Sequence, residues 1–215
     1  MKIDPGYVAT ELEKLFPEAK AELIFHNPFE CLCCVMISAQ TTDVSVNKVT
    51  PALFATYPDA KAMAQADVKD VEDKIRSIGL YRNKAKNLVE LAKILVRDYD
   101  GEVPNTKEEL VKLPGVGIKT ANVVGGECFG IPAIAVDTHV ARFAKRLGLA
   151  PEQATPEEVE AKLEKKFPKE LHIKMHHRII WFGRRICHAQ KPECGRCPFT
   201  DACLYFKKTS AMTGK

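Results

Sequence analysis

No stretch of the sequence is apolar for long enough to cross a membrane. The most apolar region, residues 122–136, is interrupted by Glu127, by glycines and by Pro132, whereas a membrane-spanning helix needs about 18 or more consecutive apolar residues. The N-terminal residues alternate charged and apolar side chains and lack the apolar segment of a secretory signal. These absences predict a protein with no membrane role and a cytoplasmic location.

Repeats and low-complexity tracts are also missing. The 12 glycines and 13 prolines of the 215 residues are scattered, and aromatic residues make up only 7%. Apolar and charged residues, at 46% and 28%, are in the ordinary range for globular proteins. Composition therefore excludes a fibrous or disordered chain and allows either one domain or two small lobes.

Acidic and basic residues are unevenly distributed along the chain. The net charge is +4, but residues 165–215 contain 12 basic and 3 acidic side chains and carry +9, whereas residues 1–164 carry −5. A local excess of this kind is typical of a surface that faces a polyanion such as DNA. A basic face that only keeps the protein soluble is the alternative.

Alternating strand patterns are absent, and apolar residues recur at helical spacing instead. The clearest case is 84–97, where Ala85, Leu88, Ala92 and Leu95 share one helix face. The other predicted helices cover residues 7–15, 29–38, 43–55, 67–76, 118–128, 138–147, 156–166 and 170–186. Predicted N-caps are Asp67, Thr106 and Thr155, the last within a capping box. The pattern predicts an all-α globule.

The eight cysteines fall into two groups. Disulfides are not expected in a cytoplasmic protein, which leaves packing, metal binding or catalysis. One group lies inside apolar helical runs and is expected to be inert core: Cys31, Cys33, Cys34 and Cys128. The other follows the pattern C-x6-C-x2-C-x5-C in a polar segment: Cys187, Cys194, Cys197 and Cys203. Four thiolates this close predict one metal centre, and their spacing alone fits either zinc or an iron–sulfur cluster.

Two glycines precede a predicted helix in the segment LPGVGIKT, residues 113–120. Gly115 and Gly117 let backbone amides turn outward, and the helix N-terminus adds its positive dipole end, so this segment can bind a phosphate. Lys119 in the first helical turn opposes that dipole, which normally costs a few tenths of a kcal/mol. It is either a phosphate contact or a nucleophilic amine whose pKa is lowered by the dipole, by burial and by neighbouring cations.

Asp137 stands immediately before another predicted helix, residues 138–147. As an isolated residue it is a plain N-cap, but a carboxylate at the rim of a cleft can also stabilise positive charge that develops on a sugar. His139 has no nucleophile near it in the sequence and is expected to be structural.

Three motifs follow one another in the order LPGVGIKTANVV, AVDTHVAR and the four-cysteine pattern. Together with residues 38–48 (SAQTTDVSVNK) and 77–85 (SIGLYRNKA), they resemble the endonuclease III family of the helix-hairpin-helix DNA glycosylase superfamily, over roughly residues 5–205. The resemblance implies a two-lobed all-α fold. A six-helix lobe would span 21–132 and carry the hairpin at about 113–119, and an iron–sulfur lobe would combine 1–20 with 133–215.

The resemblance also assigns roles to the motif residues. Lys119 matches the Schiff-base nucleophile, and Asp137 the catalytic aspartate, of a base-excision repair enzyme that removes oxidised pyrimidines and cleaves abasic sites by β-elimination. The four cysteines match the ligands of one [4Fe–4S] cluster, which favours that cluster over zinc. The remaining matches imply contacts with double-stranded DNA: Gln40, Asp43, Leu80, Gly115, Gly117, Lys191 and Arg196.

Gln40 and Leu80 match family residues that fill the space left when a base is flipped out of the duplex. From sequence alone they would be a capping amide and a core leucine. Because the catalytic chemistry needs no metal, we expect the cluster to fasten residues 187–203 into a rigid loop that presents Lys191 and Arg196 to the phosphate backbone. The family pattern further implies a monomer that is associated with the nucleoid when bound to DNA.

Two positions depart from the family pattern, and three other functions fit parts of the sequence. Ile118 stands where the family commonly has Arg or another polar residue, and Glu193 lies in a segment that is usually basic. A monofunctional adenine glycosylase of the same superfamily would lack Lys119 and carry a further C-terminal domain. A non-catalytic hairpin module would bind DNA without nicking it, and an electron carrier would need neither Lys119 nor Asp137.

Overall fold

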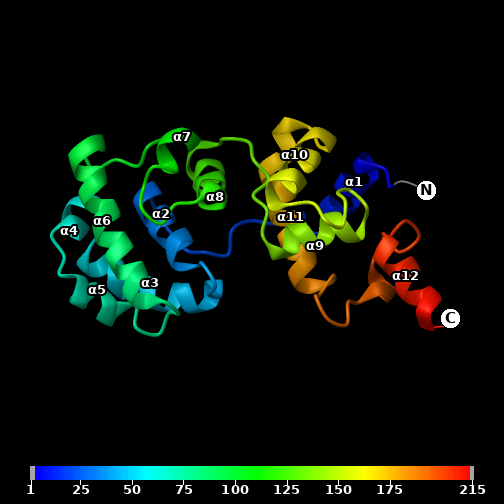
Figure 1. Cartoon of the computed structure of the whole chain (residues 1–215), viewed down its shortest axis with the longest axis horizontal. Coiled ribbons are helices and arrows are strands. Elements are labelled where there is room, and N and C mark those ends of the chain that lie inside the picture. The colour runs from blue at the N-terminus through cyan, green and yellow to red at the C-terminus, as the bar shows by residue number, and fades with distance from the viewer. Residues whose placement is uncertain (1–2, 214–215) are drawn as a thin grey trace. The chain divides into compact units, whose positions relative to one another are not determined.

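The computed structural model describes residues 3–213, and every regular element within that range is helical. The chain divides into two units, drawn in Figure 1. Residues 21–131 form the first, called the hairpin unit below, and residues 1–20 together with 132–215 form the second, called the cluster unit. The predicted all-α class is confirmed.

The hairpin unit contains seven helices in chain order. They are α2 (Pro28–Ile37), α3 (Asp43–Thr56), α4 (Ala60–Ala64), α5 (Val68–Lys74), α6 (Tyr81–Tyr99), α7 (Lys107–Leu110) and α8 (Ile118–Phe129). The long helix α6 packs against α4 and α5, and α2 packs against α8. The apolar face predicted for 84–97 is buried, because Ala85, Leu88, Ala92 and Leu95 have no solvent exposure.

The cluster unit begins with the N-terminal helix and resumes after residue 131. Its elements are α1 (Pro5–Leu15), α9 (Thr138–Arg146), α10 (Pro156–Lys166), the 3-10 turn η1 (Lys169–Leu171), α11 (His172–Arg185), η2 (Cys194–Arg196) and α12 (Leu204–Thr213). Helix α11 packs against both α1 and α9. The rings of Phe143, Phe182 and Phe199 lie with centroids 5.4–6.1 Å apart at the centre of this core, so the cysteine segment that contains Phe199 is anchored to α9 and α11.

All nine predicted helices are present, and within residues 3–213 three further helices escaped prediction. Helices α4 and α7 have five and four residues, too few for an apolar stripe to repeat. Helix α12 mixes apolar and polar residues around its circumference. Among the described residues, none of the helices combines the length and the apolar character that crossing a bilayer requires.

The predicted caps are confirmed by their hydrogen bonds. The Asp67 side chain accepts from the amide of Lys69 at 2.8 Å, and Thr155 forms both bonds of a capping box with Glu158. The Thr106 hydroxyl accepts from the third residue of α7 at 3.3 Å. These bonds satisfy amides that a helix leaves unpaired at its first turn.

Three of the four cysteines predicted to be core are completely buried: Cys31, Cys33 and Cys34. Burial raises the pKa of Cys34 to about 12 and also raises the pKa of Cys33 well above its ordinary value, which keeps both thiols protonated and unreactive. Cys128 differs from the prediction because it is only partly buried, near the end of α8, where its thiol pairs with that of Cys31.

Candidate active site and metal centre

The two glycines of the hairpin differ in backbone conformation and in the space around them. Gly115 has φ +78, and a Cβ there would lie 2.9 Å from the methyl of Met36 and 3.0 Å from the amide of Asn87. Gly117 is the N-cap of α8 with φ −89, and a Cβ there would meet nothing within 4 Å. Internal packing therefore explains why residue 115 is a glycine, whereas the absence of a side chain at Gly117 leaves the backbone there accessible to a ligand.

The first turn of α8 receives no side-chain cap. Its amides are consequently free of the usual capping partner and carry the positive end of the helix dipole. Lys119 is the second residue of this helix, and its side chain is exposed, so the expected burial of the lysine is wrong. Ile118, which departs from the family pattern, is exposed as well, at 46%. This surface of the hairpin unit combines bare amides with a primary amine.

Gln40 and Leu80 both adopt left-handed backbone conformations, with φ 57 and φ 59. Leu80 is 60% exposed and is the N-cap of α6 without a side-chain cap bond, so the interpretation as a core leucine is wrong. Gln40 is exposed too, and Thr42 rather than Gln40 caps α3. A left-handed conformation at a non-glycine residue costs on the order of 1 kcal/mol, and the fold holds both side chains outward despite it.

The buried ammonium of Lys84 lies behind the segment that carries Gln40. It donates to the carbonyls of Ile37 and Ala39 at 2.8 and 2.7 Å and to the hydroxyl of Thr41 at 3.2 Å. The Lys84 amide also donates to the carbonyl of Leu80 at 3.1 Å. One residue therefore links the end of α2, the turn at Gln40 and the start of α6.

Asp137 is the N-cap of α9, as predicted, and is partly buried. Its Oδ1 accepts from the amide of Val140 at 2.8 Å, which fixes the direction of the carboxylate and leaves Oδ2 for another contact. His139 is half-buried, with Nδ1 3.0 Å from a guanidinium nitrogen of Arg142. The prediction of a structural histidine is consistent with this packing.

The four cysteines of the C-terminal pattern line one small apolar cavity that is partly open to solvent. Within residues 3–213, no group of three or more His, Cys, Asp or Glu side chains converges closely enough for a single metal ion. A tetrahedral zinc site draws its four sulfurs to about 2.3 Å from one atom. Four thiol side chains around one cavity suit either zinc or a cluster of several irons.

Hydrogen-bond donors point at three of the four sulfurs. The pairs are Arg146 Nη1 with Cys187 Sγ at 3.2 Å, the Phe199 amide with Cys197 Sγ at 3.4 Å and the Phe206 amide with Cys203 Sγ at 3.5 Å. Donors of this kind stabilise negatively charged sulfur and tune iron–sulfur clusters. The site is thus prepared for thiolates.

Burial acts in the opposite direction on the free thiols. It raises the pKa of Cys197 to about 11 and also raises the pKa of Cys194 and of Cys203. Such thiols become thiolates when a bound cation compensates for their burial. The site has apolar walls, four sulfurs and hydrogen-bond donors next to three of those sulfurs. These features together match the requirements of an iron–sulfur cluster.

Two arginines of α9 hold the start of the cysteine segment. Arg142 donates from Nε to the carbonyl of Cys187 at 2.9 Å, and Arg146 donates to the carbonyls of the next two residues at 2.7 and 2.9 Å. Asp137 caps the N-terminus of the same helix. Helix α9 is therefore a single rigid element with the carboxylate at one end and the cysteine segment bound along its last turns.

The two basic residues predicted to contact DNA differ in how their side chains are held. Lys191 is exposed, with φ 48. Arg196 is also exposed but is bound by Glu193 at 2.6 Å and donates to the carbonyl of Arg185 at 2.6 Å. Glu193, which departs from the family pattern, thus orients Arg196. Asp43 is the first residue of α3, where a carboxylate is favoured by the helix dipole.

Sequence reasoning missed Lys84, Arg142 and Arg146. The two arginines follow Asp137 and stand four residues apart, which places them on one helix face, but their partners lie more than 40 residues further along the chain. Lys84 stands in register with the apolar stripe of α6, and a lysine at such a position is a signal for a buried charge with partners.

Comparison with known proteins decides the family. Residues 33–169 match the profile of the HhH-GPD superfamily of base excision DNA repair proteins, and residues 187–203 match that of the iron–sulfur binding domain of endonuclease III. Endonuclease III of Bacillus subtilis is 51% identical over 88% of this chain and 86% of its own length. The chain belongs to the endonuclease III family. Endonuclease III of Escherichia coli K12 is 45% identical over 94% and 95% of the two chains.

Solved structures of endonuclease III share the fold. A trapped covalent endonuclease III–DNA intermediate, described as an estranged-adenine complex, superposes with a TM-score of 0.92 at 50% identity, covering 95% of this chain and 96% of that one. The family fixes the class of function: the chain is a base-excision repair DNA glycosylase with AP-lyase activity that acts on double-stranded DNA and carries a [4Fe–4S] cluster. The predicted enzyme class is confirmed over the binding module and the electron carrier.

Proposed function

We propose that this member of the endonuclease III family excises oxidised pyrimidines with Lys119 as the nucleophile and Asp137 as the stabilising carboxylate. The exposed amine on the first turn of α8, beside amides that no side chain caps, carries the proposal. Those amides bind a backbone phosphate next to the flipped nucleotide. The Lys119 side chain then extends from the same helical turn to the sugar of that nucleotide.

The reaction begins when the neutral amine of Lys119 attacks C1′ and the bond from C1′ to the base breaks. Positive charge develops on the sugar as the base leaves, and the Asp137 carboxylate offsets it. Loss of a proton from nitrogen and opening of the sugar ring give an imine between Lys119 and C1′. The imine acidifies the proton on C2′; its removal expels the 3′ phosphate and cleaves the strand, and water releases the enzyme.

Gln40 and Leu80 occupy the space that the flipped base vacates. Both side chains point away from the core on left-handed backbone, and Lys84 anchors the segments that bear them. Unstacking a base costs a few kcal/mol, so a filled gap lowers the cost of the open state. Asp43, in the same segment as Gln40, supports the start of α3 at this surface.

Cys187, Cys194, Cys197 and Cys203 hold the [4Fe–4S] cluster, which supplies four metal–sulfur bonds that fasten the segment between them. The family profile for the iron–sulfur domain begins at the first and ends at the last of these cysteines. The fastened segment presents Lys191 and, in the orientation set by Glu193, Arg196 to the phosphate backbone. Phosphate contacts of this kind position an enzyme on duplex DNA without reading its sequence.

The hairpin unit, with bounds near 21–132, carries the nucleophile, and the cluster unit, 1–20 with 133–215, carries the carboxylate and the metal. We propose that the enzyme is a cytoplasmic monomer that associates with the nucleoid during repair, because its substrate is double-stranded DNA. Microscopy of a fluorescent fusion after oxidative damage, and light scattering of the purified protein, test location and oligomeric state.

Borohydride trapping tests the nucleophile. Reduction on a duplex that contains thymine glycol, dihydrouracil or an abasic site is expected to link the protein covalently to DNA, because borohydride reduces the imine. Lys119→Gln abolishes the link, whereas Lys112→Gln, an exposed lysine of the same unit, leaves it intact. Trapping that persists in Lys119→Gln would exclude the assignment.

Asp137→Asn is expected to slow base removal about a hundredfold or more.

A further inference from the structure

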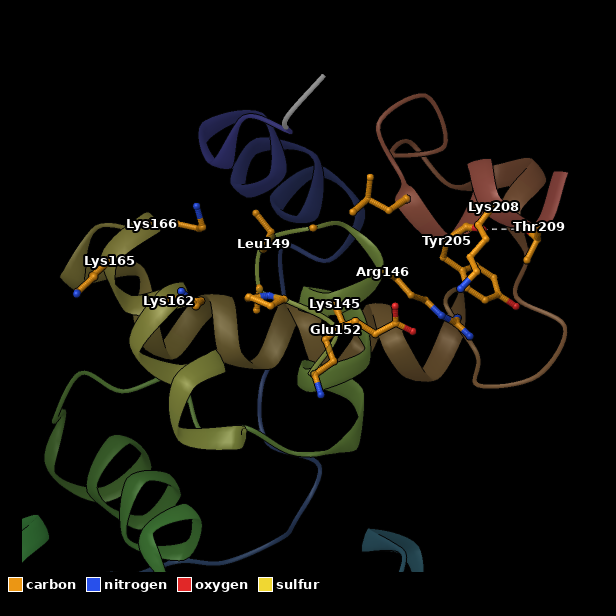
Figure 2. Close-up of a pocket in the computed structure, with 14 residues that line it drawn as sticks. Lys145, Arg146, Leu149, Glu152, Lys162, Lys165, Lys166, Tyr205, Lys208 and Thr209 are labelled. Atoms are coloured by element: carbon orange, nitrogen blue, oxygen red, sulfur yellow. Dashed lines mark hydrogen bonds between the residues drawn. The ribbon is translucent and has the colours of Figure 1, made fainter. Parts of the chain in front are cut away.

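The cluster unit contains a second, larger hollow that shares Arg146 and Tyr205 with the cysteine cavity. It measures about 820 Å³ and lies among the C-terminal ends of α9 and α10, the loop at 148–152 and the first turns of α12. Figure 2 shows the lysines of α10 at one end of the hollow, Lys208 at the other and Leu149 between them. The active-site proposal uses none of these lysines.

The rim of the hollow is strongly cationic. Five lysines and one arginine line it, with a single carboxylate from Glu152: Lys145, Arg146, Lys162, Lys165, Lys166 and Lys208. Within the described part of the chain, none of the five lysine side chains forms a hydrogen bond or an ion pair, although Lys14, Lys74, Lys93 and Lys112 all do. A concentration of uncompensated charge around one concavity attracts an anionic partner.

The floor of the hollow is apolar. Leu149 and Ala150 form it, and Leu204 projects over it with 53% of its surface exposed. The ring of Tyr205 forms part of the wall and is covered on one side by the guanidinium of Arg146, 3.9 Å from the ring centroid. Exposed apolar surface inside a charged rim is typical of a site for a partner that brings both an apolar group and opposite charges.

The hollow lacks the usual features of a phosphate site. Helices α9 and α10 turn their C-terminal ends toward it, so neither helix offers the N-terminal amides that commonly bind a phosphate. At the N-terminus of α12 the amide of Phe206 is already bound to the sulfur of Cys203. A DNA backbone would also leave the apolar floor unused.

We propose that this hollow docks an acidic segment of a partner protein, in which carboxylates flank at least one bulky apolar side chain. The apolar side chain packs against the exposed Leu204 above the floor, and the carboxylates contact the lysines of α10 and α12. Arg146 and Tyr205 keep their contacts with the cysteine segment, so docking and the cluster are compatible. The site brings the repair enzyme to a partner without occupying the surfaces proposed to contact DNA.

Fluorescence anisotropy with two labelled peptides of equal charge tests the proposal. One alternates Glu and Asp with Leu and Phe, and the other has Ser in place of each apolar residue. The first is expected to bind the holoenzyme about tenfold more tightly than the second, since apolar contacts add to the shared charge attraction. Equal affinities would overturn the proposal and assign the hollow to polyanions in general.

Substitutions at the hollow test whether the peptide binds there. Lys162→Glu with Lys165→Glu and Lys208→Glu is expected to weaken the apolar peptide tenfold or more, and Leu204→Ser to weaken it severalfold with no change in charge. The control, Lys61→Glu with Lys69→Glu and Lys174→Glu, changes the net charge equally and is expected to bind as the wild type does. Equal loss in both triple variants, or a pocket variant that loses only affinity for undamaged duplex DNA, would overturn the proposal. Circular dichroism and cluster absorbance confirm that each variant folds.

Discussion

Arg146 donates a hydrogen bond from Nη1 to the sulfur of Cys187 at 3.2 Å. The same guanidinium binds the carbonyls of His188 and Ala189 and covers the ring of Tyr205. The first turn of the cysteine segment is therefore held by α9 as well as by the metal. This arrangement makes retention of the cluster dependent on a residue that is not a ligand.

Replacement of Arg146 by Met is expected to lower cluster occupancy and to destabilise the protein by about 3 kcal/mol, because two carbonyls and a thiolate lose a charged donor. Iron content and visible absorbance measure the occupancy, and chemical denaturation measures the stability. Lys145→Met, next to it on α9, serves as the control because the Lys145 side chain makes no hydrogen bond among the described residues. Equal iron content in the two variants would show that Arg146 does not support the cluster.

The sequence predicted those parts of the site whose residues are close together in the chain. The hairpin and the four-cysteine pattern are each contained in fewer than 20 residues. The uncapped N-terminus of α8 agrees with the predicted hairpin, and the cavity that the four cysteines share agrees with the predicted metal centre. The partners of Arg146 and Lys84 could not be foreseen, because they are 41 to 47 residues away and only the packing of helices brings them together.

Leu80 shows a different limit of the sequence. Its apolar side chain favours burial by composition, yet a left-handed backbone at the start of α6 turns it outward to 60% exposure. Short-range patterns do not reveal such a conformation, since leucine rarely adopts it. Only the family resemblance pointed to its exposure, through the role of the matching residues in DNA.

Leu80→Gly is expected to raise the free energy of unfolding by about 1 kcal/mol while lowering base excision. Glycine removes the penalty of φ 59 and is tolerated at an N-cap, but the side chain that fills the vacated space is lost. Asp100→Gly is the matched control, because Asp100 has φ 54 at the opposite end of α6. It is expected to gain stability without losing activity, and parallel losses of activity in both variants would exclude the proposed role.

The two hairpin glycines are expected to respond differently to alanine. Gly115→Ala destabilises the protein by about 1–2 kcal/mol, because φ +78 and the contact with Met36 both oppose a Cβ. Gly117→Ala changes stability by less than about 0.5 kcal/mol, but the added methyl obstructs the approach of a phosphate and weakens binding to abasic duplex DNA. Chemical denaturation and anisotropy separate the effects; a destabilised Gly117→Ala, or unchanged DNA affinity, would contradict this assignment.

Lys84→Met preserves the packing of the side-chain stem but removes the donor to Ile37 and Ala39. We expect a loss of about 2–4 kcal/mol, since the buried carbonyl of Ile37 at the end of α2 and the partly buried carbonyl of Ala39 after it lose their donor. Excision from damaged duplexes should fall further than cleavage at abasic sites, because the Gln40 segment loosens. Lys86→Met, an exposed position two residues later, controls for the loss of charge and is expected to leave both properties unchanged.

His139 makes the stability of the cluster unit sensitive to acid. Burial lowers the pKa of His139 from 6.5, with Arg142 acting in the same direction and Asp137 opposing it. Below about pH 6.5 the unfolded chain therefore binds a proton that the folded chain does not, and stability falls until the pH passes the lowered pKa of the folded state. Guanidinium midpoints at pH 7.5 and 5 should differ less in His139→Asn than in the wild type, since acid effects on the cysteines are common to both. A variant with the same acid sensitivity as the wild type would mean that His139 titrates alike in the folded and unfolded chains.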